Sequence, residues 1–317
     1  MDPAVVSAET SFVKDFCVPF LASAQNDDGG WGFHPAAESR VEPTCWALRA
    51  LTNAPVAVPQ ELLRRGLQFL HYTQLADGSW PSSREEAKGS WVTSLACSVL
   101  SDTTDSAASV ATGLKWLCDD YPRDSSLLRR VIGRFRSGPS IAAHDDSFRG
   151  WGWTPQTSSW VEPTSLAILA LRECPAEWRP ATASQRSALA VRLLYDRMCP
   201  GGGWNCGNPR VYGVPGEPLV LPTAWALLAV HNLPPHENKS ASLEWLKRSY
   251  AGIHSPASLS VARIALEAYG IELPSANQEL PELFDAKEFL RTTVVVSWTA
   301  LALSPKRTWF EPQGLSA

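Results

Sequence analysis

The sequence predicts an all-α fold in which helical hairpins form an inner and an outer ring. Three observations predict it: an internal repeat, an apolar helix in each copy, and no strand-like alternation of apolar and polar residues. The chain has 317 residues, of which 44% are hydrophobic and 19% charged, as in globular proteins. We expect a single domain over residues 1–317.

Each repeat is marked by glycine beside tryptophan. Residues 25–33 read QNDDGGWGF, and residues 74–82 read QLADGSWPS. In three copies a threonine follows thirteen residues after the tryptophan: Trp31 and Thr44, Trp80 and Thr93, Trp151 and Thr164. A fourth copy runs from Trp204 to Thr223 through a loop about six residues longer. The fixed spacing indicates one structural unit used repeatedly.

The segments that follow these threonines are apolar on nearly all sides. An alanine stands three residues past the threonine in every copy, including a late copy that lacks the tryptophan: Ala47, Ala96, Ala167, Ala226 and Ala302. Leucine, isoleucine and tryptophan fill the positions between, which is a helix-favouring composition. A helix without a polar face must be buried, and its alanines allow close approach of neighbouring helices.

The segments that precede the tryptophan motifs are amphipathic instead. In residues 59–74 leucines occupy one face and Arg64 and Arg65 the opposite face, and phenylalanines recur every four residues in 11–25. Such segments predict half-exposed helices. Each repeat therefore combines an outer helix, a loop and an inner helix.

We expect six such hairpins, the last two degenerate. Their approximate bounds are residues 11–52, 59–101, 105–172, 184–231, 238–269 and 280–304. A helical insertion over about 120–145 accounts for the length of the third. The terminal repeats are not visibly polar, as the caps of an open stack are, so a closed ring is expected.

Charge and cysteine content exclude several classes of protein. The net charge of −4 and a pI near 5.9 argue against nucleic-acid binding, which needs a basic surface. No stretch approaches the roughly twenty apolar residues that span a bilayer, and residues 1–16 do not resemble a signal peptide. Seven cysteines without a CxxC pair indicate reduced thiols. We expect a cytoplasmic protein with at most peripheral membrane contact.

The two glutamine-tryptophan motifs resemble the repeats of squalene-hopene cyclases and related class II terpene cyclases. The repeated ring also resembles the β subunit of protein prenyltransferases, and the fold of both is an α/α toroid. The resemblance covers residues 12–305. It implies that Gln25, Trp31, Gln74 and Trp80 are structural, with each glutamine tying one helix end to the next.

In the cyclases a DxDD motif before the inner-helix threonine supplies the proton that starts cyclisation. This chain lacks DxDD, and RVEPT and WVEPT stand at the matching places. The resemblance therefore implies Glu42 and Glu162 as the catalytic acids, without neighbouring carboxylates to tune them. A second interpretation is helix capping, since proline and an acid are typical of a helix start.

Tryptophans near the inner-helix starts are candidate substrate-binding residues, because indoles line cavities and attract cations. They are Trp46, Trp160, Trp225 and Trp298. Core packing is the alternative for each of them. In the loop over residues 203–213, Asn205, Arg210 and Tyr212 are candidates for contact with a ligand at a cavity mouth.

No metal or other cofactor is expected. The prenyltransferase β subunits bind zinc through an Asp-x-Cys pair and a later histidine, whereas the matching segments here read EPT, EPT and LPT. The six histidines show no paired ligand spacing.

Three functions remain open. The first is a terpene cyclase-like enzyme, an isomerase or lyase acting on a squalene-type or polyprenyl substrate. The second is a non-catalytic protein that binds an isoprenoid or another lipid. The third is a scaffold subunit that binds a protein partner, as a prenyltransferase β subunit does.

Overall fold

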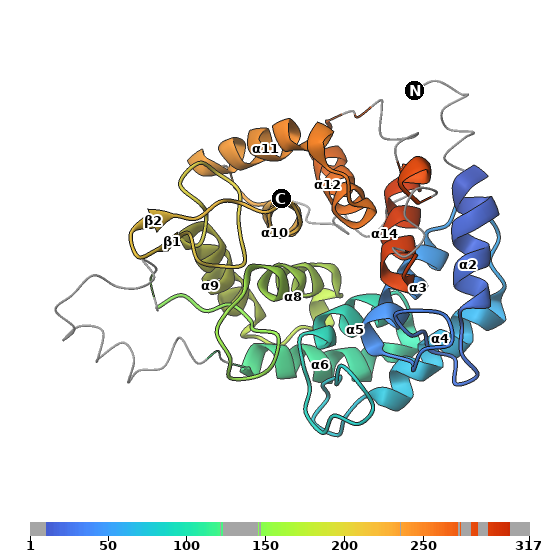
Figure 1. The fold of residues 1–317 in the computed structure, drawn as a ribbon. Helices are drawn as coiled ribbons and strands as arrows, with labels where there is room; N and C mark the ends of the chain where they lie inside the picture. The colour runs from blue at the N-terminus through green and yellow to red at the C-terminus, as the bar shows by residue number, and fades with distance from the viewer. Residues whose placement is uncertain are drawn as a thin grey trace. The chain divides into compact units, whose positions relative to one another are not determined.

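The computed structural model describes residues 11–120, 122, 145, 147–234, 236–271, 273, 280–284 and 291–304. The chain divides into two compact units, which we call unit 1 and unit 2. Unit 1 comprises Met1–Ala76, Trp80–Lys88 and Gly252–Ala317, and unit 2 comprises Asp77–Ser79 and Gly89–Ala251. Figure 1 shows that both consist almost entirely of helices.

Unit 1 has two layers of helices (Figure 1). Its buried layer consists of α3 (Val41–Thr52), α12 (Pro256–Ala268) and α14 (Thr293–Leu303), and α14 contacts both of the others. The second layer consists of the π-helix η1 (Val13–Cys17), α2 (Val18–Ser23) and α4 (Gln60–Thr73). Helix α4 packs on α3, and η1 and α2 pack on α14. Unit 1 thus joins helices from both ends of the chain.

Unit 2 repeats this two-layer arrangement. Its buried layer consists of α5 (Val92–Leu100), α8 (Val161–Glu173) and α10 (Val220–Val230), and α8 contacts both of the others. The second layer consists of α6 (Ala107–Asp119), α9 (Ala183–Asp196) and α11 (Glu237–Ser249), which pack on α5, α8 and α10 respectively. Short 3-10 helices are η2 (Thr104–Ser106), η4 (Ala176–Trp178) and η5 (Tyr250–Gly252).

The five apolar segments predicted from the threonine-alanine spacing are the buried helices α3, α5, α8, α10 and α14. Their five alanines are at most 1% exposed. The amphipathic segments form the second layer, with only part of each helix buried. Most of the helical insertion predicted over 120–145 lies outside the described residues.

The tryptophan motifs join the two layers. Each indole Nε1 donates to a backbone carbonyl near the end of the preceding outer helix, as Trp31 does to Leu21 O at 2.7 Å and Trp151 to Leu117 O at 2.8 Å. In three of the motifs the tryptophan N–H also donates to the threonine that opens the next inner helix: Trp31 to Thr44 and Trp151 to Thr164 at 2.9 Å, and Trp204 to Thr223 at 2.8 Å. These buried bonds fix the loop at both ends.

Gln25 contributes a similar tie in unit 1. Its Nε2 donates to Gly29 O within its own loop and to Leu62 O in α4, both at 2.9 Å. Gly29 has φ +87° and lies against the backbone of Arg65. A Cβ at this position would be only 2.5 Å from the Arg65 carbonyl oxygen. The motif therefore needs glycine at this position.

One feature differs from the expected absence of strands. Strands β1 (Arg210–Val211) and β2 (Val214–Pro215) form a hairpin in the long loop after Trp204. Its two-residue turn has φ of +52° at Tyr212 and +80° at Gly213, which matches the twist of a tight hairpin. Strands of two residues are too short to produce an alternating pattern in the sequence.

Candidate active site at the start of helix α8

Glu162 lies in the first turn of α8. Hydrogen bonds that involve Trp151, Trp160 and Thr164 hold that turn in place. Trp160, the N-cap residue, is extended (φ −120°, ψ 153°), and its N–H donates to Trp151 O at 2.9 Å. Trp151 in turn is anchored by Thr164, one turn into the helix. The repeat motif therefore sets where α8 begins and where the Glu162 carboxyl emerges.

The Glu162 carboxyl is half-buried in an uncharged environment. Burial raises the pKa of Glu162 above its ordinary value of 4.5, because desolvation disfavours the charged form. Among the described residues no cation forms an ion pair with Glu162, and no donor forms a hydrogen bond with its carboxyl. A carboxyl held in this way keeps its proton to a higher pH, as a general acid requires.

The alternative interpretation of Glu162 as a helix cap has less support. The N–H of Val161, at the start of α8, donates instead to the backbone carbonyl of Cys206 at 3.3 Å. The Thr164 N–H donates to Trp160 O at 3.2 Å, and Pro163 has no N–H. Most of the first-turn donors that a side-chain cap would satisfy are thus already paired or absent.

Three indoles form a cluster beside the start of α8. Trp153 packs edge to face against Trp91, with ring centroids 5.0 Å apart, and lies 6.4 Å from Trp160. The N–H of Trp91 also donates to Trp153 O at 3.2 Å. Trp160 is 37% exposed, and Trp91 and Trp153 are half-buried, so all three retain some accessible surface. Trp91 and Trp153 were not among the candidates from the sequence, although both neighbour a repeat motif.

Cys206 brings a thiol to the same helix start from a loop 44 residues later. Burial, followed by the negative charge of Glu162, raises the pKa of Cys206. The thiol is half-buried, whereas the other six cysteines are buried. The sequence carries no periodic signal for this contact, because it depends on the path of the loop after Trp204.

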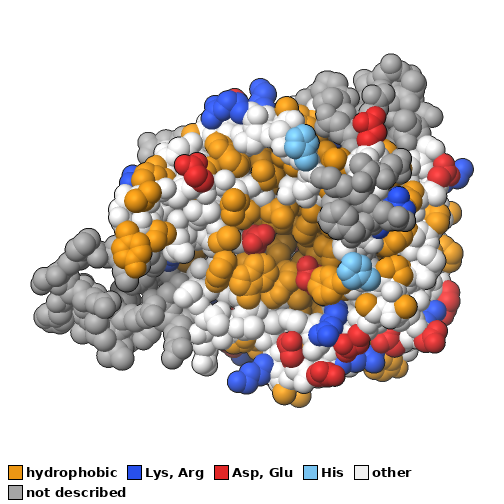
Figure 2. All heavy atoms as spheres, in the orientation of Figure 1, with side chains coloured by type: hydrophobic (Ala, Val, Ile, Leu, Met, Phe, Trp, Pro, Cys, Tyr) orange, Lys and Arg blue, Asp and Glu red, His pale blue; other side chains and the backbone are white. Residues whose placement is uncertain are grey.

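Three other predicted residues of unit 2 belong to different elements. Trp225 is 2% exposed within α10, as expected of a core residue. Arg210 and Tyr212 belong to the β1–β2 hairpin, where Tyr212 is 76% and Val214 65% exposed. Figure 2 shows hydrophobic side chains at the surface over this hairpin.

Unit 1 contains the second set of predicted residues. Glu42 is half-buried in the first turn of α3. Trp46 on α3 and Trp298 on α14 meet edge to face, with centroids 5.6 Å apart, and Trp46 is only 2% exposed. Glu42 and the buried Arg49 both act electrostatically on Cys45, so a cation shares this helix with Glu42. The basic residue of α8 is Arg172, in the last turn of the helix, and its guanidinium donates to the Leu228 and Ala229 carbonyls.

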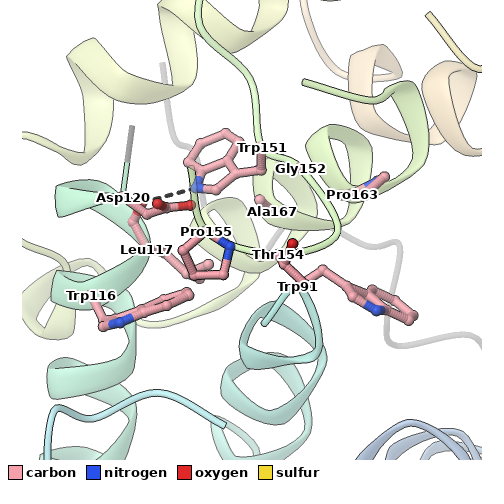
Figure 3. Close-up of a pocket in the computed structure, with 10 residues that line it drawn as sticks. All are labelled: Trp91, Trp116, Leu117, Asp120, Trp151, Gly152, Thr154, Pro155, Pro163 and Ala167. Atoms are coloured by element: carbon pink, nitrogen blue, oxygen red, sulfur yellow. Dashed lines mark hydrogen bonds between the residues drawn. The ribbon is translucent and has the colours of Figure 1, made fainter. Parts of the chain in front are cut away.

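A small pocket lies behind the Trp151 loop, between α6 and the start of α8 (Figure 3). Trp116 and Asp120 line one side, and Trp91 and Pro163 lie at the other. The centre of a water molecule has about 10 Å³ in which to move there. This is room for about one water, so the pocket does not accommodate an isoprenoid.

The described residues contain no group of three or more histidine, cysteine or acidic side chains that would hold a metal ion. None of their helices is long and apolar enough to cross a bilayer.

Comparison with known proteins finds similarity in short segments of sequence. No family model matches the chain. The drimenyl diphosphate synthase of Streptomyces showdoensis is 40% identical over 67 residues, which are 21% of this chain and 13% of that protein. The squalene–hopene cyclase of Bradyrhizobium diazoefficiens is 38% identical over 81 residues, 22% of this chain and 12% of that protein. The matched segments span less than one seventh of either relative.

Solved structures show similarity over more than nine tenths of the chain. A protein from Actinoplanes has a TM-score of 0.61 at 16% identity, covering 93% of this chain and 99% of that one. The type II terpene cyclase MstE from Scytonema has a TM-score of 0.56 at 14% identity, covering 95% and 81%. The chain has the fold of the type II terpene cyclases. The predicted resemblance to class II terpene cyclases and the predicted fold class, an all-α toroid, are thereby confirmed.

Proposed function

We propose that the chain binds an apolar isoprenoid, of the squalene or polyprenyl kind, and starts its cyclisation or isomerisation with a proton from Glu162. Support comes from the fold shared with MstE, which is described as a type II terpene cyclase. The segments similar to a squalene–hopene cyclase and a drimenyl diphosphate synthase point to the same class of chemistry.

The observation that carries the proposal is the environment of the Glu162 carboxyl. Its pKa is raised by burial, with neither a cation nor a hydrogen-bond donor on it in the described part of the chain. Protonation of an alkene needs a neutral acid kept from water, because water would compete for the proton and quench the cation. The indoles of Trp91, Trp153 and Trp160 offer π-faces toward which a positive charge is attracted.

The proposed step is balanced within the site. The Glu162 O–H gives its proton to one carbon of an alkene, whose π electrons form the new C–H bond and leave a cation on the adjacent carbon. A second alkene of the same substrate attacks that cation and forms a C–C bond. Loss of a proton from the final cation to a base ends the reaction, and Glu162 regains a proton before the next turnover.

Glu42 remains the second proposed acid, since it occupies the same position in α3. Burial is the cause of the raised pKa of Glu162, whereas Glu42 acts electrostatically on the buried Cys45 of its own helix, so Glu162 is the first candidate. Trp46 and Trp298, which meet edge to face in unit 1, and Trp225, which is buried in α10 of unit 2, are proposed as packing residues. Arg210 and Tyr212, in the exposed hairpin of unit 2, are proposed to contact the ligand at its entrance.

Incubation of the protein with squalene, oxidosqualene and linear polyprenyl diphosphates, followed by mass spectrometry of the products, tests the proposal. We expect cyclised or isomerised products that disappear in Glu162→Gln. Loss of the products in Glu42→Gln instead would assign the acid to Glu42. Turnover that is unaffected by Glu162→Gln would refute this residue as the acid.

Analysis of what the purified protein retains distinguishes the two non-catalytic functions. Retention of one host lipid in native mass spectrometry, without turnover of any of the substrates, would indicate a lipid-binding protein. A stoichiometric protein partner without bound lipid would indicate a scaffold subunit.

A further inference from the structure

The loop that follows Trp204 reaches the start of α8 and takes over its capping. The Cys206 carbonyl accepts the Val161 N–H at 3.3 Å. A Cβ on Gly207 would lie 3.5 Å from Ser159 O and 4.0 Å from the Val161 nitrogen, so the loop backbone lies directly against this helix start. A helix end supplied in this way does not need a nearby carboxylate as a hydrogen-bond acceptor.

Asn205 organises this part of the loop. Its Oδ1 accepts the N–H groups of Gly207 and Asn208 at 3.0 and 2.9 Å, and its Nδ2 donates to Asn208 O at 2.9 Å. One side chain thus satisfies three backbone groups and holds the chain in a tight turn. The turn is also attached to α9, because Arg197, which is 3% exposed, donates from Nη1 to Gly207 O at 3.1 Å.

We propose that the Asn205–Asn208 turn is a positioning element of the Glu162 site, which caps α8 through the Cys206 carbonyl and leaves the Glu162 carboxyl free to face a ligand. Asn205 is the positioning residue, since it holds the turn without contacting the acid. The proposal rests on Glu162 being the functional acid, but the contact between turn and helix is testable without any substrate.

Cys206 provides the readout, because it is the cysteine that the described structure leaves partly accessible while the other six are buried. Its pKa is raised in part by the negative charge of Glu162. Iodoacetamide reacts with the thiolate, so the alkylation rate reports both the exposure of Cys206 and the charge on Glu162. The rate would be measured in the full chain between pH 5 and pH 9 by intact-protein mass spectrometry.

In the wild-type turn, Glu162→Gln is expected to increase the alkylation rate at pH 8 by about twofold or more, because the loss of a nearby negative charge favours the thiolate. The two rates should converge at low pH, where Glu162 is protonated. Glu42→Gln is the matched control and should leave the rate unchanged. Cys206→Ser gives the background from the buried cysteines.

Asn205→Ala is expected to release the turn. Alkylation of Cys206 should then be faster, and adding Glu162→Gln should no longer change the rate. Asn205→Asp keeps the acceptor oxygen for Gly207 and Asn208, so it should restore most of the dependence on Glu162. Circular dichroism and the melting temperature establish that both variants are folded before they are compared.

Two outcomes would overturn the proposal. An alkylation rate that Glu162→Gln leaves unchanged at every pH would show that Cys206 does not lie beside the acid. A dependence on Glu162 that survives Asn205→Ala in full would show that Asn205 does not position the turn. Neither outcome depends on turnover. The alkylation rates therefore test the position of the turn even if the protein has no enzymatic activity.

Discussion

Glu42 and Glu162 occupy the same position in two helices that begin with the same four residues, yet their environments differ. Burial raises the pKa of Glu162, and its charge acts on Cys206 from a distant loop. Glu42 acts instead on Cys45, which is buried on the same helix. The motif alone predicted both as acids, because a repeated sequence carries no information on what a distant loop places beside each copy. The contact of Cys206 with the start of α8 is of this kind, because it depends on the path of a loop that lies far away in the sequence.

The raised pKa of Glu162 predicts a specific pH dependence of stability. Well below pH 4.5 the carboxyl is protonated in the folded and unfolded states and has no effect. As the pH rises past that value, the unfolded chain releases the proton first, so the free energy of unfolding falls until the folded-state pKa is passed. Glu162→Gln removes this loss and should be more stable than wild type near pH 8, and about equal to it near pH 4.

Urea unfolding of both proteins at pH 4, 6 and 8 measures this difference. The sign is diagnostic, because a carboxylate that caps a helix or forms an ion pair would give the opposite trend. Wild type gaining stability over Glu162→Gln with rising pH would therefore contradict a buried, unpaired acid.

The buried Trp31 predicts a large contribution of a motif tryptophan to stability. It is fully buried, and its Nε1 donates to Leu21 O at 2.7 Å. Trp31→Phe should lower the free energy of unfolding by about 2–4 kcal/mol, because it leaves a cavity and a buried carbonyl without its donor. Trp160→Phe, at a site that is 37% exposed, should cost less than about 1 kcal/mol. Equal costs in urea unfolding would contradict the structural role of Trp31.

At the scale of elements, the sequence was most informative where a pattern repeats. The spacing of threonine and alanine identified all five helices of that pattern, because a helix buried on every side leaves an apolar run that is visible without the fold. It did not identify the five-residue π-helix Val13–Cys17, where phenylalanines predicted an ordinary amphipathic helix. A change of hydrogen-bond register within a helix leaves no compositional signal.

The threonine that opens each inner helix predicts an element-scale effect. Thr164 Oγ1 accepts the Trp151 N–H at 2.9 Å and is itself fully buried. Thr164→Val removes that acceptor and should cost about 1–3 kcal/mol, the penalty for a buried N–H left unpaired. Thr164→Ser retains the hydroxyl and should cost less.

Amide hydrogen exchange at Trp151 distinguishes this effect from simple repacking. Exchange should become at least about tenfold faster in Thr164→Val, because the N–H loses its acceptor, and should stay slow in Thr164→Ser. Equal protection in the two variants would show that the threonine contributes only its methyl group.

At the scale of the whole molecule, unit 1 depends on both ends of the chain. Thr293, the first residue of α14, donates from its N–H to Phe33 O at 2.9 Å and from Oγ1 to Gly32 O at 2.6 Å, and the second bond spans 261 residues of sequence. The hydroxyl oxygens of Ser260 on α12 and Thr299 on α14 form a hydrogen bond of 3.0 Å. The sequence predicted a single domain, and contacts of this length are what would make unfolding of the chain cooperative.

A chain that ends at Ala251 tests how unit 1 is held together. It lacks α12 and α14, so the apolar surface of α3 that packs on α14 is exposed to water. Amides of α3 should lose protection from hydrogen exchange almost completely, because the inner helix has a buried partner on one side only. Retention of full-length protection in α3 would show that α4 and α2 suffice to hold it. The amides of α8, measured in the same experiment, decide the domain prediction: protection lost together with α3 identifies one cooperative domain, and protection kept identifies unit 2 as a domain that folds without the C-terminal helices.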